Sequence, residues 1–270
     1  MTVRPDGYRL QVDPWERLYQ AKERNWTLDA EVVEVDRVNR QGQIWKIQFL
    51  DIPDVQGLVP ASETGLENEQ LMRLFVGQPI RVKVKGLDAE SGIAACSRLE
   101  VLDEARKQLL AELREGEIIE CIVRAVLAPE KDKPARVLLD IGGGVLVEVP
   151  RVQAAIWSAL PLGRQYVRGQ TVKAKITQVD PKTGTVQVSP RDALPDPWET
   201  AGYRRGQDVR GYVTGMDSRH IFVEVRPGLI GLANNTGHPL VRPGQKVVCR
   251  VKNFNREQRR LHLAYRNMCL

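Results

Sequence analysis

Apolar and polar residues alternate along three segments of the chain, and each segment begins at a Gly-Gln pair. The alternation follows Gly77, Gly169 and Gly244, with apolar side chains at every second position and mostly basic or polar side chains between them. Because successive side chains of a β-strand point to opposite faces, one face of each segment enters a core and the other presents cations. The pattern predicts a strand-rich unit that is repeated three times.

The first repeat contains the full set of elements that the pattern predicts. Five strand candidates, rich in valine and isoleucine and separated by turn sequences, lie at 28–38, 43–50, 55–61, 79–87 and 93–98. A short helical stretch at 67–75 separates the third strand from the fourth. This is the arrangement of an OB-fold, a small Greek-key barrel whose open face binds oligonucleotides. The predicted fold class is mainly β, with three tandem five-stranded OB-fold barrels joined by short helices.

The connectors between the barrels carry different signals. Leucines recur at helical spacing through 99–114, and Gly116 ends that run. Asp-Pro-Trp-Glu occurs twice, at 13–16 and 196–199, and we expect its tryptophan to anchor each connecting segment on a barrel. The predicted order is a helical lead-in (1–26), barrel 1 (27–98), a linker helix (99–115), barrel 2 (116–191), a Pro-Trp linker (192–205) and barrel 3 (206–270).

Charge is distributed unevenly along the chain. The formal net charge is +6, yet residues 202–270 hold thirteen Lys or Arg against four Asp or Glu, whereas the first 201 residues hold twenty-seven against thirty. A basic region is the electrostatic footprint of phosphate binding, since neutralised phosphates release their counterions. A solvated surface that aids solubility explains a basic segment equally well. Barrel 3 is therefore a candidate, and no more than that, for contact with nucleic acid.

Other sequence signals exclude several kinds of protein. The four cysteines form no CxxC pair, which favours a reduced, cytoplasmic chain. No apolar run approaches the roughly 18 residues of a membrane-spanning helix, and the polar first ten residues predict no membrane targeting. The three histidines lack the spacing of a metal site, and the glycines at 142–144 lack the lysine of a phosphate loop. We expect a monomer and a non-enzyme, with no cofactor, metal, catalytic residue or membrane partner.

An ordered set of short motifs resembles one known family. Pro-Trp-Glu at 14–16 is followed by Gln-Gly-Leu-Val-Pro-Ala-Ser at 56–62, by Val-Lys-Gly-Leu-Asp at 84–88 and by Cys-Ser-Arg at 96–98. With Leu-Pro-Asp-Pro-Trp-Glu at 194–199, this order is similar to the bacterial ribosomal protein S1 family over nearly the whole chain. The resemblance implies three consecutive domains of a longer protein. It also implies binding of single-stranded RNA, and of mRNA in particular, on the open face of a barrel.

The resemblance further implies which residues contact RNA. In this family an aromatic residue on the second strand stacks on a base, a histidine follows the third strand, an Asp or Asn ends the fourth, and an arginine lies on the fifth. In barrel 3 these positions fall at Phe222, Asn234, Asn255 and Arg260. The alternation of side chains adds three further candidates in the same barrel: Arg250, Lys252 and His262. Tyr212 is a fourth, as a second ring for stacking, and a core position is the alternative for both Tyr212 and Phe222.

Barrels 1 and 2 depart from the family pattern. Leu138 takes the aromatic position in barrel 2 and Thr185 the arginine position, while Pro60 and Ile93 replace the histidine and the arginine in barrel 1. The sequence leaves open whether these barrels bind RNA. Their alternating basic side chains form a secondary set of candidates: Arg81, Lys83, Lys85, Lys173 and Lys175.

Two functions fit the sequence. The first is a non-catalytic RNA-binding protein of translation or RNA handling, in which tandem barrels stack on bases and contact phosphates. The Pro-Ala-Ser sequence at 60–62 resembles an early domain associated with ribosome contact, so the small ribosomal subunit is a further candidate partner. The alternative is a protein-interaction scaffold that docks on the ribosome or on an RNA-processing complex. The poor site of barrel 2 favours that alternative.

Overall fold

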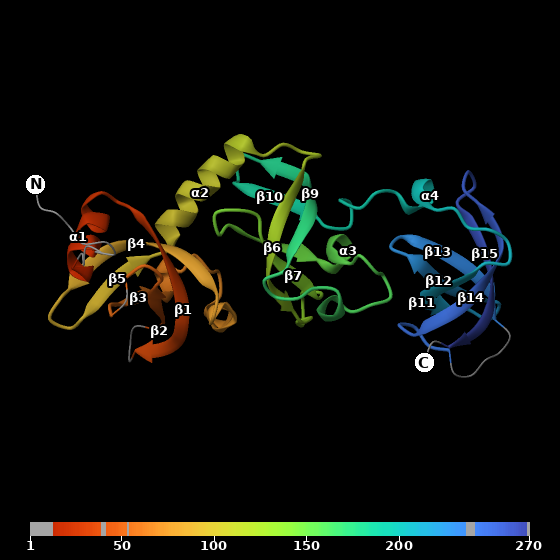
Figure 1. Cartoon of the computed structure of the whole chain (residues 1–270), viewed down its shortest axis with the longest axis horizontal. Coiled ribbons are helices and arrows are strands. Elements are labelled where there is room, and N and C mark those ends of the chain that lie inside the picture. The colour runs from red at the N-terminus through yellow and green to blue at the C-terminus, as the bar shows by residue number, and fades with distance from the viewer. Residues whose placement is uncertain (1–12, 39–41, 53, 236–240, 269–270) are drawn as a thin grey trace, which may run out of the picture. The chain divides into compact units, whose positions relative to one another are not determined.

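A computed structural model describes residues 13–38, 42–52, 54–235 and 241–268 of the chain. Its strands form three separate five-stranded sheets, two of them closed barrels (Figure 1). The chain divides into two compact units, Met1–Glu112 with the loop Gly142–Val145, and Leu113–Ile141 with Leu146–Leu270. The first unit contains barrel 1 and the second contains barrels 2 and 3. The predicted mainly β fold with tandem OB-type barrels is confirmed.

Barrel 1 is closed in the order β1-β2-β3-β5-β4, with every pair antiparallel except β3 and β5. Trp45 is fully buried at its centre, where the ring contacts Phe75 and Nε1 donates to the carbonyl of Met72 at 3.0 Å. The predicted helix after the third strand is a 3-10 helix, η2. The elements of this part of the chain are α1 (Pro14–Glu23), β1 (Thr27–Val38), β2 (Gly42–Phe49), β3 (Gln56–Pro60), η1 (Ala61–Glu63), η2 (Glu69–Phe75), β4 (Pro79–Asp88) and β5 (Ile93–Ser97).

The linker helix α2 (Leu99–Glu112) packs on β4 of barrel 1. It buries Val101 and Leu102, the apolar side of the leucine pattern. The loop Gly142–Val145 belongs to the same unit, because the buried Arg98 donates from Nη2 to the carbonyl of Gly144 at 2.8 Å. The triple glycine is therefore a packing element, as its lack of phosphate-loop signals predicts.

Barrel 2 is a five-stranded sheet of order β10-β9-β6-β7-β8. Between its two edge strands lies α3, where the carbonyl of Gln153 accepts from Ser189 Oγ at 3.2 Å and from the Arg191 N–H at 3.0 Å. In barrel 1 the corresponding strands, β3 and β5, pair directly with each other. In barrel 2 these two hydrogen bonds through α3 take the place of that pairing. The elements are β6 (Ile118–Leu127), β7 (Arg136–Asp140), β8 (Leu146–Pro150), α3 (Arg151–Ala154), η3 (Leu162–Arg164), β9 (Thr171–Asp180) and β10 (Thr185–Ser189).

Barrel 3 is closed in the order β11-β12-β13-β15-β14. Its core holds the inward residues of every strand, and β13 and β15 are again the parallel pair. The elements are α4 (Pro197–Thr200), β11 (Asp208–Met216), β12 (His220–Arg226), β13 (Leu229–Asn234), β14 (Lys246–Asn255) and β15 (Arg260–Met268).

The repeated Asp-Pro-Trp-Glu motif forms the same local structure at both of its sites. Asp13 accepts the Trp15 N–H at 3.0 Å and Asp196 accepts the Trp198 N–H at 2.9 Å. Each aspartate is thus a helix N-cap, and the proline at the first helical position has no N–H to leave unpaired. Trp198 is buried and stacks on Phe254, with centroids 5.8 Å apart and planes 3° apart. It anchors the second connector on barrel 3.

The cysteines of the described residues are buried in the barrels. Cys96, Cys121 and Cys249 are free, and burial raises the pKa of each thiol to about 12. Cys269 and His238 lie outside the described residues. Within the part of the chain that the structure describes, no helix is long and apolar enough to cross a membrane.

Candidate nucleic-acid interface

The register of barrel 3 brings one residue from each of four strands into a row. Phe222 on β12 pairs with Leu232 on β13, Leu232 lies beside His262 on β15, and His262 pairs with Asn253 on β14. Residues paired in this way share a face of the sheet. Their chain neighbours, such as Ile221 and Leu263, are buried in the core. We call Phe222, Leu232, His262 and Asn253 the barrel 3 row.

Two shorter rows flank the barrel 3 row on the same face. On one side, His220 pairs with Asn234. His220 is two residues from Phe222 on β12, and Asn234 is two residues from Leu232 on β13. On the other side, Arg260 pairs with Asn255 at the hairpin between β14 and β15. Phe222 is half-buried, whereas Asn234, Arg260 and His262 are exposed. Five of the eight candidates in barrel 3 therefore share this face: Phe222, Asn234, Asn255, Arg260 and His262.

The other candidates of barrel 3 have different surroundings. Arg250 forms a two-bond ion pair with Asp208, at 2.7 Å from Nε and 2.8 Å from Nη2, which raises the pKa of Arg250 and lowers that of Asp208. The half-buried Tyr212 ring contacts Trp157 edge to face at 5.2 Å and lies 6.0 Å from Lys246 Nζ. Two of the expected RNA contacts thus have protein partners. Lys252 is exposed and precedes Asn253 at a register shift of β14.

Asn255 has a structural role that recurs in all three barrels. Its Oδ1 accepts the N–H of Gln258 at 2.9 Å and so closes the hairpin before the last strand. Asp88 accepts the N–H of Ser91 at 3.2 Å, and Asp180 accepts that of Lys182 at 2.9 Å, at the same place in barrels 1 and 2. Hydrogen bonds hold the pKa of both aspartates below the ordinary value. This turn explains why an Asp or Asn ends the fourth strand, with or without RNA.

The position of Phe222 is occupied by Lys46 in barrel 1. The first strand of each barrel shifts register just before this position, which gives the pairs Gly215 with Phe222, Ala125 with Leu138 and Glu34 with Lys46. Lys46 Nζ lies 2.8 Å from Asp36 and 3.2 Å from Glu34, and these carboxylates raise the pKa of the lysine. The sequence alone does not locate this position in barrel 1, because its loop after the second strand is longer. The paired strand shift is the signal that locates it.

Barrel 2 has neither an exposed ring nor an unbalanced charge at the same position. Leu138 is only 3% exposed and pairs with Glu148. Glu148 in turn accepts from Arg136 Nε at 2.8 Å. Arg124 binds Asp140 through Nη2 at 2.7 Å, with both side chains largely buried. The charged side chains on this face of barrel 2 are thus paired with other residues of the same barrel.

The secondary set of basic candidates does not form one exposed stripe. Lys83 is only 2% exposed, and its Nζ lies 2.5 Å from Glu104 on α2, so the expected surface position of Lys83 is wrong. The helix covers β4 at Lys83, on the side that the alternation assigned to solvent. Lys85 also binds a helix residue, Glu100, although it is exposed. The remaining three reach the surface at least in part: Arg81, Lys173 and Lys175.

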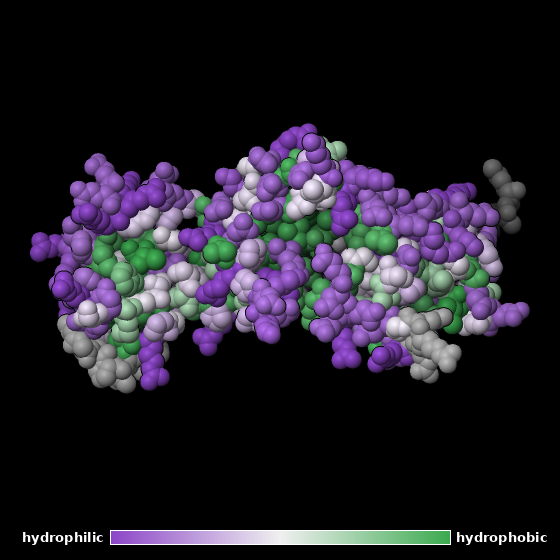
Figure 2. Space-filling view, turned by 180° about the vertical axis from the view of Figure 1, so that it is seen from behind, coloured by the Kyte–Doolittle hydropathy of each residue, from purple (hydrophilic) through white to green (hydrophobic). Residues whose placement is uncertain are grey.

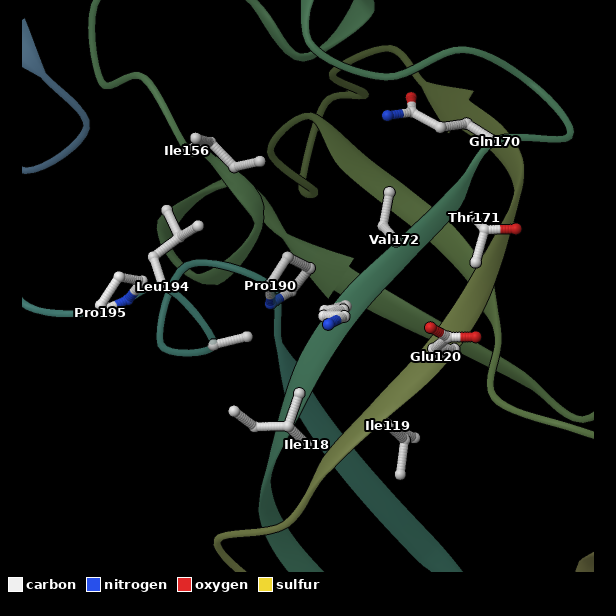
Figure 3. A pocket seen from close by; sticks show the side chains of 12 residues that line it. Ile118, Ile119, Glu120, Ile156, Gln170, Thr171, Val172, Pro190, Leu194 and Pro195 are labelled. Carbon is white, nitrogen blue, oxygen red and sulfur yellow. The ribbon is translucent and has the colours of Figure 1, made fainter.

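A cleft of about 730 Å³ opens beside β6 and β9, the first and fourth strands of barrel 2. Its apolar lining residues come from β6, β9, the segment after α3 and the residues after β10: Ile118, Ile119, Ile156, Val172, Pro190, Ala193, Leu194 and Pro195. Figure 3 shows Ile156, Leu194 and Pro195 on one side of the cleft and the polar Gln170, Thr171 and Glu120 on the other. Hydrophilic residues dominate the face of the molecule that Figure 2 displays, with hydrophobic patches among them. The cleft thus has an apolar side and a polar side.

Three OB-type barrels, one with a basic residue, a histidine and an aromatic ring on its open face, define a tandem OB-fold protein. Curated relatives named small ribosomal subunit protein bS1 match it at 31% identity in Staphylococcus aureus strain MRSA252, covering 77% of this chain and 56% of that protein. The match in Staphylococcus saprophyticus is 28% identical and covers 93% and 63%. The chain is a homologue of these bacterial bS1 proteins, and the resemblance is confirmed.

The relatives are longer than this chain, which spans about 56–63% of the length of these two. A bS1 homologue of Bacillus cereus is 26% identical, over 88% of this chain and 67% of that protein. No protein-family model matches the chain. Among solved structures, a multidomain protein with nucleic acid binding domains from Streptococcus pneumoniae covers 90% of this chain at 14% identity, with a TM-score of 0.27, a similarity too low to carry an argument.

Proposed function

We propose that this protein is a non-catalytic binder of single-stranded RNA and that barrel 3 makes the main contact. The observation that carries the proposal is the placement of Phe222 on β12 and of His262 and Arg260 on β15 on one open face. A base stacked on one aromatic ring is worth about 1–3 kcal/mol and tolerates any sequence. Cations follow the phosphates and make the affinity fall with salt.

The charges of barrel 3 support this assignment. Within the described residues, its ion pairs join Arg250 to Asp208, Arg259 to Asp196 and His220 to Asp217, and Arg260 takes part in none of them. An exposed guanidinium on the same face as a stacking ring allows one barrel to hold RNA both by a base and by a phosphate. The equivalent positions in barrels 1 and 2 lack this combination.

Titration of a fluorescein-labelled single-stranded oligoribonucleotide over a range of salt concentrations tests the proposal. Phe222→Ala should weaken binding by about 5- to 150-fold, the equivalent of the stacking energy. Arg260→Ala should weaken binding and reduce the salt slope by about one. Lys46→Ala, the matched variant in barrel 1, should bind as the parent chain does. Unchanged affinity in both barrel 3 variants would sink the proposal.

The names of the relatives add a partner to the proposal. Because the bS1 proteins are named as small ribosomal subunit proteins, we infer that this chain acts with the small ribosomal subunit in translation. Cosedimentation of the chain with purified small subunits tests this step. Deletion of residues 202–270 shows whether the association depends on barrel 3. Free migration of the full chain at low salt would contradict it.

The cleft of barrel 2 favours a second function, docking of a protein. Ile118 lines this cleft and is 51% exposed. Only a minority of the large apolar side chains in the described residues are exposed to this degree. The two charged lining residues, Glu120 and Lys173, are cross-strand partners whose charges offset each other. An electrically balanced apolar cleft offers nothing to a phosphate backbone and fits an uncharged aliphatic segment of a protein. RNA and protein would then bind to different barrels of one chain.

Substitution of one exposed residue separates this function from RNA binding. Ile118→Lys should reduce cosedimentation with small subunits in high salt and leave oligoribonucleotide affinity unchanged. Ile122→Lys, on the same strand and outside the cleft lining, is the matched control. Equal cosedimentation of both variants and the parent chain would rule out the cleft as a docking site.

A further inference from the structure

The barrel 3 row contains two flat side chains that lie on different strands. Phe222 is on β12 and His262 is on β15, and Leu232 on β13 lies between them. We propose that the row holds two bases of an unstacked single strand, one on Phe222 and the other against His262 and Asn253. This inference rests on the proposed function, because it concerns the same face.

The spacing of the strands decides what kind of RNA fits the row. Neighbouring strands are about 4.8 Å apart, so Phe222 and His262, with one strand between them, are roughly 10 Å apart. Successive bases in a stacked helix are only about 3.4 Å apart. Two stacked neighbours therefore cannot occupy both side chains, and the strand must be extended with its bases separated. A duplex, whose bases stay stacked, does not meet that condition.

The two ends of the row have different chemistry. Phe222 and Leu232 carry no hydrogen-bonding group, so the base on Phe222 is held by its face alone. The exposed His262 and Asn253 carry an imidazole and an amide, which offer donors and acceptors to the edge of a base. The row thus has an end that accepts any base and an end that distinguishes bases.

The flanking residues place the backbone of the RNA. Arg260 lies two residues from His262 along β15, on the side of the row away from His220 and Asn234. Because β13 and β15 are parallel, Ile230 and Arg260 lie on one side of the row and Asn234 on the other. The Arg260 guanidinium is therefore placed to contact a phosphate of the nucleotide whose base lies against His262 and Asn253. Sequence discrimination should then depend on the fifth strand of the barrel.

Binding of labelled oligo(U), oligo(C) and oligo(A) of one length to the full chain tests the inference. His262→Ala should lower the affinity by about 5-fold or more and bring the three affinities closer together. His262→Phe keeps a ring and removes the polar edge, so it should retain affinity and lose discrimination. Phe222→Ala should weaken all three by one factor and leave their ratios unchanged. A duplex of the same length should bind far more weakly than each single strand.

The outcomes separate this inference from the function on which it rests. If Phe222→Ala weakens binding and His262→Ala does not, the two-base row is wrong and RNA binding by barrel 3 stands. If neither substitution has an effect, the proposed function itself fails. His262 is exposed, so its replacement should leave the fold intact, and an unchanged circular dichroism spectrum verifies this. Equal affinity for duplex and single strand would also overturn the inference.

Discussion

The ammonium of Lys83 lies 2.5 Å from the carboxylate of Glu104, and the lysine is almost fully buried while the glutamate is largely exposed. This pair joins β4 of barrel 1 to the linker helix α2. A buried ammonium is costly unless a partner compensates its charge. The stability of barrel 1 is therefore coupled to the presence of the helix.

We predict that Glu104→Ala destabilises the first unit by about 1.5–3 kcal/mol, the range of hydrogen bonds to charged groups. Lys83→Met, which removes the buried charge and keeps the volume, should be neutral or stabilising. Urea unfolding followed by tryptophan fluorescence measures both. Glu100→Ala breaks the exposed pair with Lys85 and is the control, with a smaller expected loss. Equal losses for Glu100→Ala and Glu104→Ala would contradict the burial argument.

A second prediction concerns the triple-glycine loop that packs on α2. Gly143 has a φ of +61°, and a Cβ added there would lie 2.5 Å from Cβ of Ala105. Gly143→Ala should therefore destabilise the protein by about 1–3 kcal/mol, through strain and overpacking together. Thermal unfolding compares it with Gly163→Ala, whose added Cβ meets no atom within 4 Å. The argument fails if the two variants melt at the same temperature.

The strands of barrel 1 and the start of the linker helix could be predicted to within one residue, because both depend on local patterns. Alternation marks a strand wherever one face is buried, and Asp-Pro-Trp caps a helix by contacts within three residues. Lys83 was misplaced because a helix from another part of the chain covers its strand. Tyr212 gained an unexpected partner, Trp157, for the same reason. Burial by elements that are distant in the sequence is a tertiary property, and the local alternation of apolar and polar residues does not predict it.

The site was predictable in part. The resemblance to the S1 family singled out Phe222, Asn234 and Arg260, and the register of the strands puts these three residues on one face of barrel 3. The row itself needed the register, since Leu232 and Asn253 carry no signal in the sequence. Equivalence between barrels also depended on register, because the strand shift that aligns Lys46 with Phe222 is invisible when loops differ in length.

The turn aspartates predict a response to acid. Hydrogen bonds from Thr183 and Lys182 hold the pKa of Asp180 below 3.8, its ordinary value. A lowered folded-state pKa contributes stability above pH 3.8, and that contribution is lost as the pH falls through the lowered pKa. Asp180→Asn keeps the turn as Asn255 does in barrel 3, so its stability should fall less between pH 4 and pH 2. Parallel acid unfolding curves for parent and variant would contradict this role of the carboxylate.

The buried thiols predict resistance to alkylation. A pKa of about 12 for Cys96, Cys121 and Cys249 leaves almost no thiolate at neutral pH. In a Cys269→Ser variant, which removes the cysteine outside the described residues, maleimide should react slowly in buffer and rapidly in denaturant. Mass spectrometry counts the adducts. Fast labelling of the folded variant would show that the barrels open more easily than their burial implies.

The most demanding prediction moves the stacking site from one barrel to another. In barrel 1, Lys46 occupies the position of Phe222, and Glu34 and Asp36 neutralise it. In a Phe222→Ala background, Lys46→Phe alone should recover little affinity for RNA, because both carboxylates then face the phosphates without a partner.

Lys46→Phe combined with Glu34→Gln and Asp36→Asn removes that repulsion and restores a ring beside Leu58, as Phe222 lies beside Leu232. In a Phe222→Ala background, the triple change should recover part of the lost affinity for single-stranded RNA. The same carboxylate changes with Lys46→Leu provide the control, since they alter the charge without adding a ring. Recovery in the leucine variant as well would assign the gain to charge alone. Recovery only with phenylalanine would show that the barrels share one binding geometry and differ in the side chain placed at a single register position.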